Sequence, residues 1–177
     1  VFKKKPDERF SRTMDGAHQA IFCNVLSSQN SLQLKNSVLK LNIGGISNIH
    51  KEYMGYGWMR YNMHLISAVY NLQWIKSLSK KTKLIVGNQG LFQSNVNRGI
   101  HIVIPDARTV ENGLSATLNY RLEQIYIEGG ISGNYRFIKT LFNPYFNTIG
   151  TGVRPFEKSF PSINGMLAIT FHLFKFE

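Results

Sequence analysis

The sequence has only one cysteine, Cys23, and no apolar run of about 18 residues. A single cysteine cannot form an internal disulfide, and Cys23 has no partner at the spacing of a zinc site. We therefore interpret Cys23 as a small, buried apolar side chain. A membrane-spanning helix needs about 20 consecutive apolar residues, so this sequence supplies no such helix.

The sequence also lacks the short motifs of the common catalytic sites. It contains no Gly-x-Ser-x-Gly elbow, no phosphate-binding loop and no His-Glu-x-x-His sequence. Its 10 acidic residues show no paired-carboxylate context. The pairs Gly44-Gly45 and Gly129-Gly130 suit close packing or bulges in strands better than a nucleotide-binding loop. We expect a protein that is not an enzyme and that uses no cofactor.

Negative charge is scarce, and the formal net charge is +11. A basic protein can bind nucleic acid, but no recognition-helix pattern or RNA-binding motif accompanies the charge. The basic residues cluster only near the N-terminus and around one turn. They are Lys3, Lys4, Lys5, Arg9 and Arg12, then Lys76, Lys80, Lys81 and Lys83. We expect no nucleic-acid partner, since a basic rim equally suits the anionic lipid of a membrane surface.

The feature that is abundant is an alternation of apolar and polar residues. From Gly113 to Leu122 every second residue is apolar, and the same pattern returns from Ile125 to Phe137. A period of two predicts strands, because a helix would mix the two sets around its circumference. Residues 121–124 can form only a tight connection between these two strands, so the pair is predicted to be a long hairpin.

Five further segments alternate in the same way, near residues 18–34, 39–50, 66–74, 84–92 and 163–173. Most of the seven predicted strands have roughly ten residues or more. Soluble strands average about five or six residues, whereas membrane-spanning strands need about 9–11. Strand length therefore favours a membrane barrel over a soluble sandwich.

The predicted connections alternate in length. Those at 35–36, 78–81 and 121–124 are short, and those at 51–59, 97–111 and 139–157 are long. Short turns at one end and long loops at the other are typical of outer-membrane barrels, whose long loops lie outside the cell. Tyr70, Trp74 and Tyr120 precede short turns, where aromatic residues favour the membrane interface. The sequence thus predicts an all-β fold, an antiparallel up-and-down segment of a transmembrane β-barrel.

The predicted domain organisation is simple. We expect an irregular basic segment over residues 1–16, a piece of an extracellular loop, followed by a partial barrel over residues 17–177. Seven strands cannot close with antiparallel pairing throughout. We therefore expect two unpaired edges and a need for further strands or for dimerisation. Since the chain starts at Val1 without a signal peptide, we expect a processed chain or a fragment.

Candidate ligand-binding residues lie in or beside the predicted long loops. Imidazole binds transition metals, and guanidinium groups bind carboxylates at two points. The candidates are His50, Lys51, Glu52, His64, Arg98, His101, Arg108 and Arg154. His18 is expected at the same end of the strands, and His172 at the other. No histidine pair has the i, i+4 spacing of a helical metal site, so we predict no specific metal site.

A second set of polar residues alternates with the apolar face of the strands. In a barrel these side chains would face the lumen, where they contact water or an inner domain. They are Lys40, Asn42, Asn119, Arg121, Glu128, Ser132, Asn134 and Arg136. Arg121 and Glu128 are candidates for an ion pair between adjacent strands.

Four segments resemble, in order, barrel segments of Bacteroidetes-type TonB-dependent outer-membrane receptors. They are NSLQLKNSVLKLNIGGISNIHKEY (30–53), NMHLISAVYNLQWIKSLSKKTKLIVGNQGLFQSNVNRG (62–99), IPDARTVENGLSATLNYRL (104–122) and SFPSINGMLAITFHL (159–173). Together the resemblance covers about residues 10–173. The sequence departs from the family because it contains neither a plug domain nor a TonB box, and its predicted loop at 51–59 is short for the family.

The resemblance implies a barrel of about 22 strands around an N-terminal plug. Such a receptor would lie in the outer membrane of a Gram-negative cell and take up a scarce ligand. Ferric siderophores, haem, cobalamin, metal ions and glycans are the ligands that the family suggests. The implied partners are outer-membrane lipid, the remaining barrel strands, the plug and, through the plug, TonB.

Two other functions remain open at the level of the sequence. The chain could be a soluble all-β binding module, such as a sandwich that presents its long loops. It could also be a small autonomous outer-membrane barrel with a structural or adhesive role. Dependence on detergent for solubility would separate the soluble module from both membrane proteins.

Overall fold

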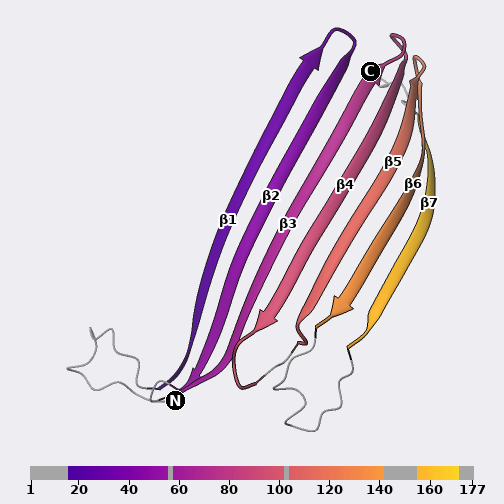
Figure 1. The fold of residues 1–177 in the computed structure, drawn as a ribbon. Helices are drawn as coiled ribbons and strands as arrows, with labels where there is room; N and C mark the ends of the chain where they lie inside the picture. The colour runs from indigo at the N-terminus through magenta and orange to yellow at the C-terminus, as the bar shows by residue number, and fades with distance from the viewer. Residues whose placement is uncertain (1–15, 56–57, 102–103, 142–154, 172–177) are drawn as a thin grey trace.

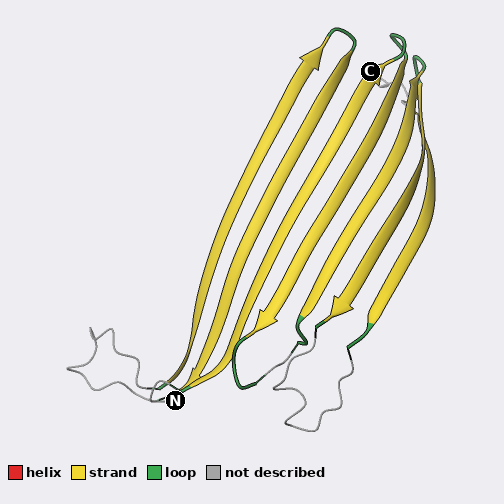
Figure 2. Cartoon of the chain, in the orientation of Figure 1, coloured by secondary structure: helices red, strands yellow, loops and turns green. Residues whose placement is uncertain are grey.

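The computed structural model describes residues 16–55, 58–101, 104–141 and 155–171, which form one sheet of seven strands (Figure 1, Figure 2). The strands are β1 (Ala17–Leu34), β2 (Ser37–Met54), β3 (Met59–Ser77), β4 (Thr82–Asn97), β5 (Ala107–Arg121), β6 (Ile125–Thr140) and β7 (Glu157–Phe171). Each strand pairs antiparallel with its neighbours in the sequence. This confirms the predicted all-β, up-and-down fold. The described residues contain no helix long and apolar enough to cross a membrane.

The sheet is open at both edges. In the described part of the chain, β1 pairs only with β2 and β7 pairs only with β6. Because the strands alternate in direction, β1 and β7 run the same way (Figure 1). The two edges therefore cannot pair with each other antiparallel, as expected for an odd number of strands.

The strands are longer than the alternation alone predicted, with 15 to 19 residues each. The largest difference concerns residues 51–59, which we predicted to be a long loop. β2 continues to Met54, and the chain reverses at Gly55, whose φ of 102° suits glycine. Trp58 N then donates a hydrogen bond to Gly55 O at 3.1 Å. The loop prediction was wrong because polar residues at a strand end still pair when a partner strand lies beside them.

The other connections differ in length between the two ends of the sheet, as predicted. The turns at 35–36, 78–81 and 122–124 are short and lie at one end of the sheet, at the top of Figure 1. The connections at 98–106 and 141–156 leave from the opposite end, which we call the loop end. Both are shorter than predicted, because the strands on either side take up residues that the sequence analysis had assigned to the loops.

Cross-strand pairing sorts the side chains onto two faces. One face carries Leu39 together with its cross-strand partners Leu32 and Trp74, and we call it the apolar face. Its exposed hydrophobic residues come from every strand and include Ile163, which is 90% exposed. The charged residues of this face lie only near strand ends: Lys51, Lys76, Arg108, Lys139 and Glu157.

The opposite face, which we call the polar face, carries Glu111 and Arg136 further from the strand ends than any charge of the apolar face. It also carries Lys40 and Glu128, which lie as far from a strand end as Lys51 does. Cys23 also lies on this face and is exposed, so the prediction that it is buried was wrong. The reason is that β1 is an edge strand with one neighbour, which leaves its side chains uncovered.

The sheet has almost no core of its own. Tyr61 is the only buried hydrophobic residue in the described part of the chain. Burial of apolar area is the main stabilising term for folded proteins in water. A sheet of this kind must therefore gain stability from a cover of lipid or protein on its apolar face.

Trp74 and Tyr120 lie on the apolar face near short turns, as predicted, whereas Tyr70 lies further along its strand. The Tyr70 ring lies beside Gly90, its cross-strand partner on β4. Its hydroxyl donates to Asn88 Oδ1 at 2.7 Å and accepts from Asn112 Nδ2 at 2.8 Å. Gly90 thus makes room for an aromatic ring that links three strands.

Gly90→Ala is expected to destabilise the protein, because a Cβ there would lie 2.8 Å from Tyr70 Cζ. Overpacking of this kind typically costs about 1–3 kcal/mol. Gly133→Ala is the matched control, since nothing lies within 4 Å of a Cβ built on this glycine of the same face. Denaturant titration in detergent or lipid measures both variants. Equal stability of the two would contradict the packing of Tyr70 against Gly90.

Candidate functional site

Two of the predicted ligand-binding residues lie together on the polar face at the loop end. His50 and Glu52 belong to β2 and not to a loop, and their Nε2 and Oε1 atoms are 3.7 Å apart. Gln19 Nε2 donates to Glu52 Oε1 at 2.9 Å. The His50 ring meets Tyr61 edge-on, with centroids 5.3 Å apart. These four side chains form a small polar cluster at the end of the sheet.

The other strand-borne candidates point the opposite way. Lys51 and His64 lie on the apolar face, where His64 Nε2 is 3.0 Å from Ser47 Oγ. His18 lies at the same end and stacks on Tyr53 with centroids 4.6 Å apart. His50 and His64 therefore cannot share a ligand, although both lie at the loop end. The described residues hold no group of three His, Cys, Asp or Glu suited to a metal ion.

The remaining candidates are dispersed. Arg98 and His101 lie in the connection after β4, where their backbone N–H groups donate to Asn62 O and Arg60 O at 2.8 Å. Arg108 lies within β5 on the apolar face, so its assignment to a loop was wrong. Arg154 and His172 lie outside the described residues. Arg98 and Arg108, the described arginines of this set, thus lie in the connection after β4 and on the apolar face of β5.

A polar cluster that the sequence analysis missed holds the connection between β4 and β5. Asp106 Oδ1 accepts from Asn97 N at 2.7 Å and from Asn97 Nδ2 at 2.6 Å. Asn97 Nδ2 also donates to Ile104 O at 2.7 Å, and Asn95 Nδ2 donates to Pro105 O at 3.1 Å. All three polar side chains are buried. The sequence offered one sign of this cluster, because Asn95 and Asn97 are two residues apart and therefore lie on the same face of a strand.

These contacts also fix the orientation of both amides. Because each Nδ2 atom donates to oxygen, the Oδ1 atoms of Asn95 and Asn97 must point away as acceptors. Both Oδ1 atoms are buried and receive no hydrogen bond from the described residues, and the same holds for Asn48 Oδ1. Three buried amide oxygens of the polar face therefore have no donor in the part of the chain that the structure describes.

The residues predicted to face a lumen all lie on the polar face. Lys40, Asn42, Asn119, Arg121, Glu128, Ser132, Asn134 and Arg136 share it through the register of β2, β5 and β6. The structure describes both Arg121 and Glu128, and they do not form the expected ion pair. Arg136 instead pairs with Glu111, its cross-strand partner, and Glu128 accepts from Tyr126 Oη at 3.2 Å.

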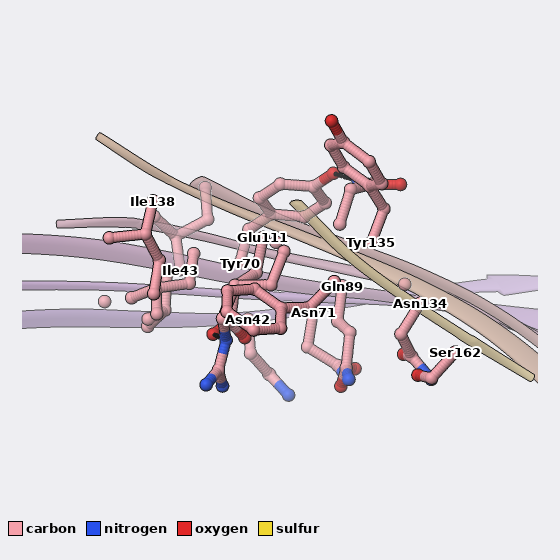
Figure 3. A pocket seen from close by; sticks show the side chains of 18 of the residues that line it. Asn42, Ile43, Tyr70, Asn71, Gln89, Glu111, Asn134, Tyr135, Ile138 and Ser162 are labelled. Atoms are coloured by element: carbon pink, nitrogen blue, oxygen red, sulfur yellow. Dashed lines mark hydrogen bonds and ion pairs between the residues drawn. The ribbon is translucent and has the colours of Figure 1, made fainter. Parts of the chain in front are cut away.

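The polar face is hollowed at mid-height. A cavity of about 790 Å³ is lined by residues of all seven strands, so this face is concave. Figure 3 shows Gln89, Asn134 and Ser162 on one side of the strands and Tyr70 and Tyr135 on the other. The cavity therefore belongs to the polar face, and the apolar face lies behind it.

One row of paired residues crosses the whole hollow. Consecutive cross-strand partners from β1 to β7 are Gln29, Asn42, Asn71, Gln89, Gly113, Asn134 and Ser162. All seven line the cavity. We call this set the amide row, since five of its members carry side-chain amides. Sequence alternation placed Asn42 and Asn134 on this face, but only the register aligns them with Gln29, Asn71 and Gln89.

No protein family, curated protein or solved structure matches the chain.

Asp106→Ala is expected to release the connection at 98–106, because it leaves two donors of Asn97 without their acceptor. An unsatisfied buried group costs about 1–3 kcal/mol. Hydrogen exchange of residues 98–106 should accelerate, while exchange at the β1–β2 turn serves as an internal reference. Asp106→Asn, which keeps an acceptor oxygen, should perturb the connection less. Unchanged exchange in Asp106→Ala would show that other contacts hold this segment.

Proposed function

We propose that this chain is part of the barrel wall of a TonB-dependent receptor in the outer membrane of a Gram-negative cell. In this role the apolar face contacts lipid and the polar face lines the interior. The receptor would take up a scarce ligand, for which the resemblance offers ferric siderophores and metal ions as examples. Its partners would be outer-membrane lipid, the other strands of the barrel, the plug and, through the plug, TonB.

The observation that carries the proposal is the partition of charge between the two faces. No Asp, Glu, Lys or Arg of the apolar face lies further from a strand end than Lys51, whereas Glu111 and Arg136 lie further in on the polar face, beside the amide row. A lipid-facing surface requires such a charge-free band, about 25 Å tall in known barrels. The strands also suffice in length, because even 15 residues exceed the 9–11 or so that a tilted strand needs.

The open edges define what must complete the wall. Backbone N–H and C=O groups cannot stay unpaired in hydrocarbon, so β1 and β7 each need another strand. Since the two edges run the same way, an odd number of further strands closes the barrel with antiparallel pairing. A second copy rotated about the barrel axis would put β7 beside a β1 of the same direction. A second copy arranged in this way therefore cannot supply the remaining strands.

Ile131→Arg tests the membrane-facing assignment. Ile131 lies on the apolar face and is 70% exposed, so in water the substitution would be nearly neutral. Facing the middle of a bilayer, it should cost about 2–4 kcal/mol. Ser132→Arg, the neighbouring residue on the polar face, is the matched control. Denaturant titration of the full-length protein in lipid vesicles measures both.

Two outcomes would contradict the proposal. Equal stability of Ile131→Arg and Ser132→Arg in vesicles would show that Ile131 does not face lipid. A monodisperse, folded protein in the absence of detergent would favour the soluble all-β module instead. The receptor role is tested separately by deleting the gene and measuring growth on limiting ligand, where a receptor predicts a growth defect that the intact gene restores.

A further inference from the structure

The apolar face carries three hydrogen-bond donors in one register row at the loop end. Consecutive cross-strand partners on β4, β5 and β6 are Ser94, Arg108 and Lys139, and we call this set the donor row. Neighbouring strands lie about 4.7–4.9 Å apart. A hydroxyl, a guanidinium group and an ammonium group, all able to donate hydrogen bonds, are therefore carried on adjacent strands of one face.

The two cations of the donor row are not equally compensated. Arg108 and Lys139 lie directly opposite each other, and like charges in that position destabilise a pair of strands. Lys139 Nζ pairs with Glu157 Oε1 of its partner on β7. Arg108 is exposed, and its side chain forms no ion pair or hydrogen bond with the described residues. An anion beside Arg108 would remove the cost of placing it opposite a second cation.

The next row of the same face, towards the turns, is apolar. The same three strands contribute Phe92, Val110 and Phe137 to it, and we call this set the apolar row. Phe92 and Val110 are 43% and 44% exposed, so their side chains are open to the surroundings. Between the donor row and the turns, no charged residue lies on the apolar face of β4, β5 or β6. The donor row therefore borders an open, uncharged surface.

A ligand that matches both rows has an anionic head and an apolar body. Phosphate oxygens accept hydrogen bonds from a guanidinium group at two points, and they also accept from ammonium and hydroxyl groups. Acyl chains cover an apolar surface without losing any hydrogen bond. A free phosphate ion would use the donor row alone and would leave the apolar row uncovered. Both rows together thus fit a phosphorylated lipid better than a soluble anion.

We propose that the donor row binds the phosphate group of a membrane lipid whose acyl chains lie over the apolar row. This site rests on the proposed membrane wall, and it adds a headgroup contact of defined chemistry to the contact of the apolar face with hydrocarbon. The site also fixes the depth of the wall in the bilayer, because lipid phosphates then lie level with Arg108 at the loop end.

The test uses the full-length protein in detergent micelles with one of three probes. They are phosphatidic acid, diacylglycerol with the same acyl chains, and inorganic phosphate without lipid. Native mass spectrometry measures the bound probe. We expect phosphatidic acid to bind, and the other two probes to bind about tenfold or more weakly, since each lacks one half of the match.

Substitutions in the donor row should change this binding in opposite directions. Arg108→Gln is expected to weaken the binding of phosphatidic acid about tenfold. Glu157→Gln is expected to strengthen it, because the substitution frees Lys139 for the phosphate. Lys76→Gln is the matched control, since Lys76 is a cation of the same face at the turn end, with its Nζ 5.4 Å from the centroid of the Trp74 ring. It should bind phosphatidic acid as the unsubstituted protein does.

Equal binding of phosphatidic acid and diacylglycerol, or binding that Arg108→Gln leaves unchanged or that Lys76→Gln weakens equally, would overturn the inference. Inorganic phosphate that binds as tightly as phosphatidic acid would also overturn it, in favour of a soluble anion. Denaturant titration first verifies that each variant folds, and Arg108→Met replaces Arg108→Gln if that variant does not.

The failure of this site and the failure of the membrane wall are distinguishable. If Ile131→Arg destabilises the protein in vesicles and phosphatidic acid does not bind, only the headgroup site is refuted. If Ile131→Arg and Ser132→Arg are equally stable in vesicles, the membrane wall is refuted, and the headgroup site with it.

Discussion

Continuous antiparallel backbone pairing is the interaction on which the rest of this structure depends. Seven strands pair over nearly their whole lengths, while the described residues bury only one hydrophobic side chain. Without a core, the backbone hydrogen bonds hold the sheet together, and the surroundings must stabilise its apolar face. In the proposed barrel wall, lipid is that stabilising surrounding, the charges of the apolar face lie near the strand ends, and the two unpaired edges need further strands.

The same pairing arranges the polar face. Register brings five side-chain amides and Gly113 into one row, and it places Glu111 opposite Arg136 so that their charges cancel. At the loop end, Asn95, Asn97 and Asp106 hold the connection between β4 and β5 against the sheet. The polar face thus combines a hollow lined by side-chain amides with hydrogen-bonded residues at the loop end.

Single side chains were harder to predict than strands. His50 and His64 were both placed correctly at the loop end, but they lie on opposite faces because one residue of offset reverses the direction of a side chain. Lys51 and Glu52 looked like loop because they are charged, yet they pair with β3. The alternation places Asn95 and Asn97 on one face but does not show that Asn97 binds Asp106, since these hydrogen bonds join residues nine apart across a connection.

The sequence by itself determined the strand character, the number of strands, the two faces and the unequal lengths of all connections except that between β2 and β3. Each of these follows from the period of two, which is a local property of the chain. Only the tertiary structure decided which residues stand opposite one another: the amide row, the partner of Arg136 and the position of the Tyr70 ring beside Gly90. Register depends on where each hairpin turns, and a shift of one residue at a turn changes every pairing beyond it.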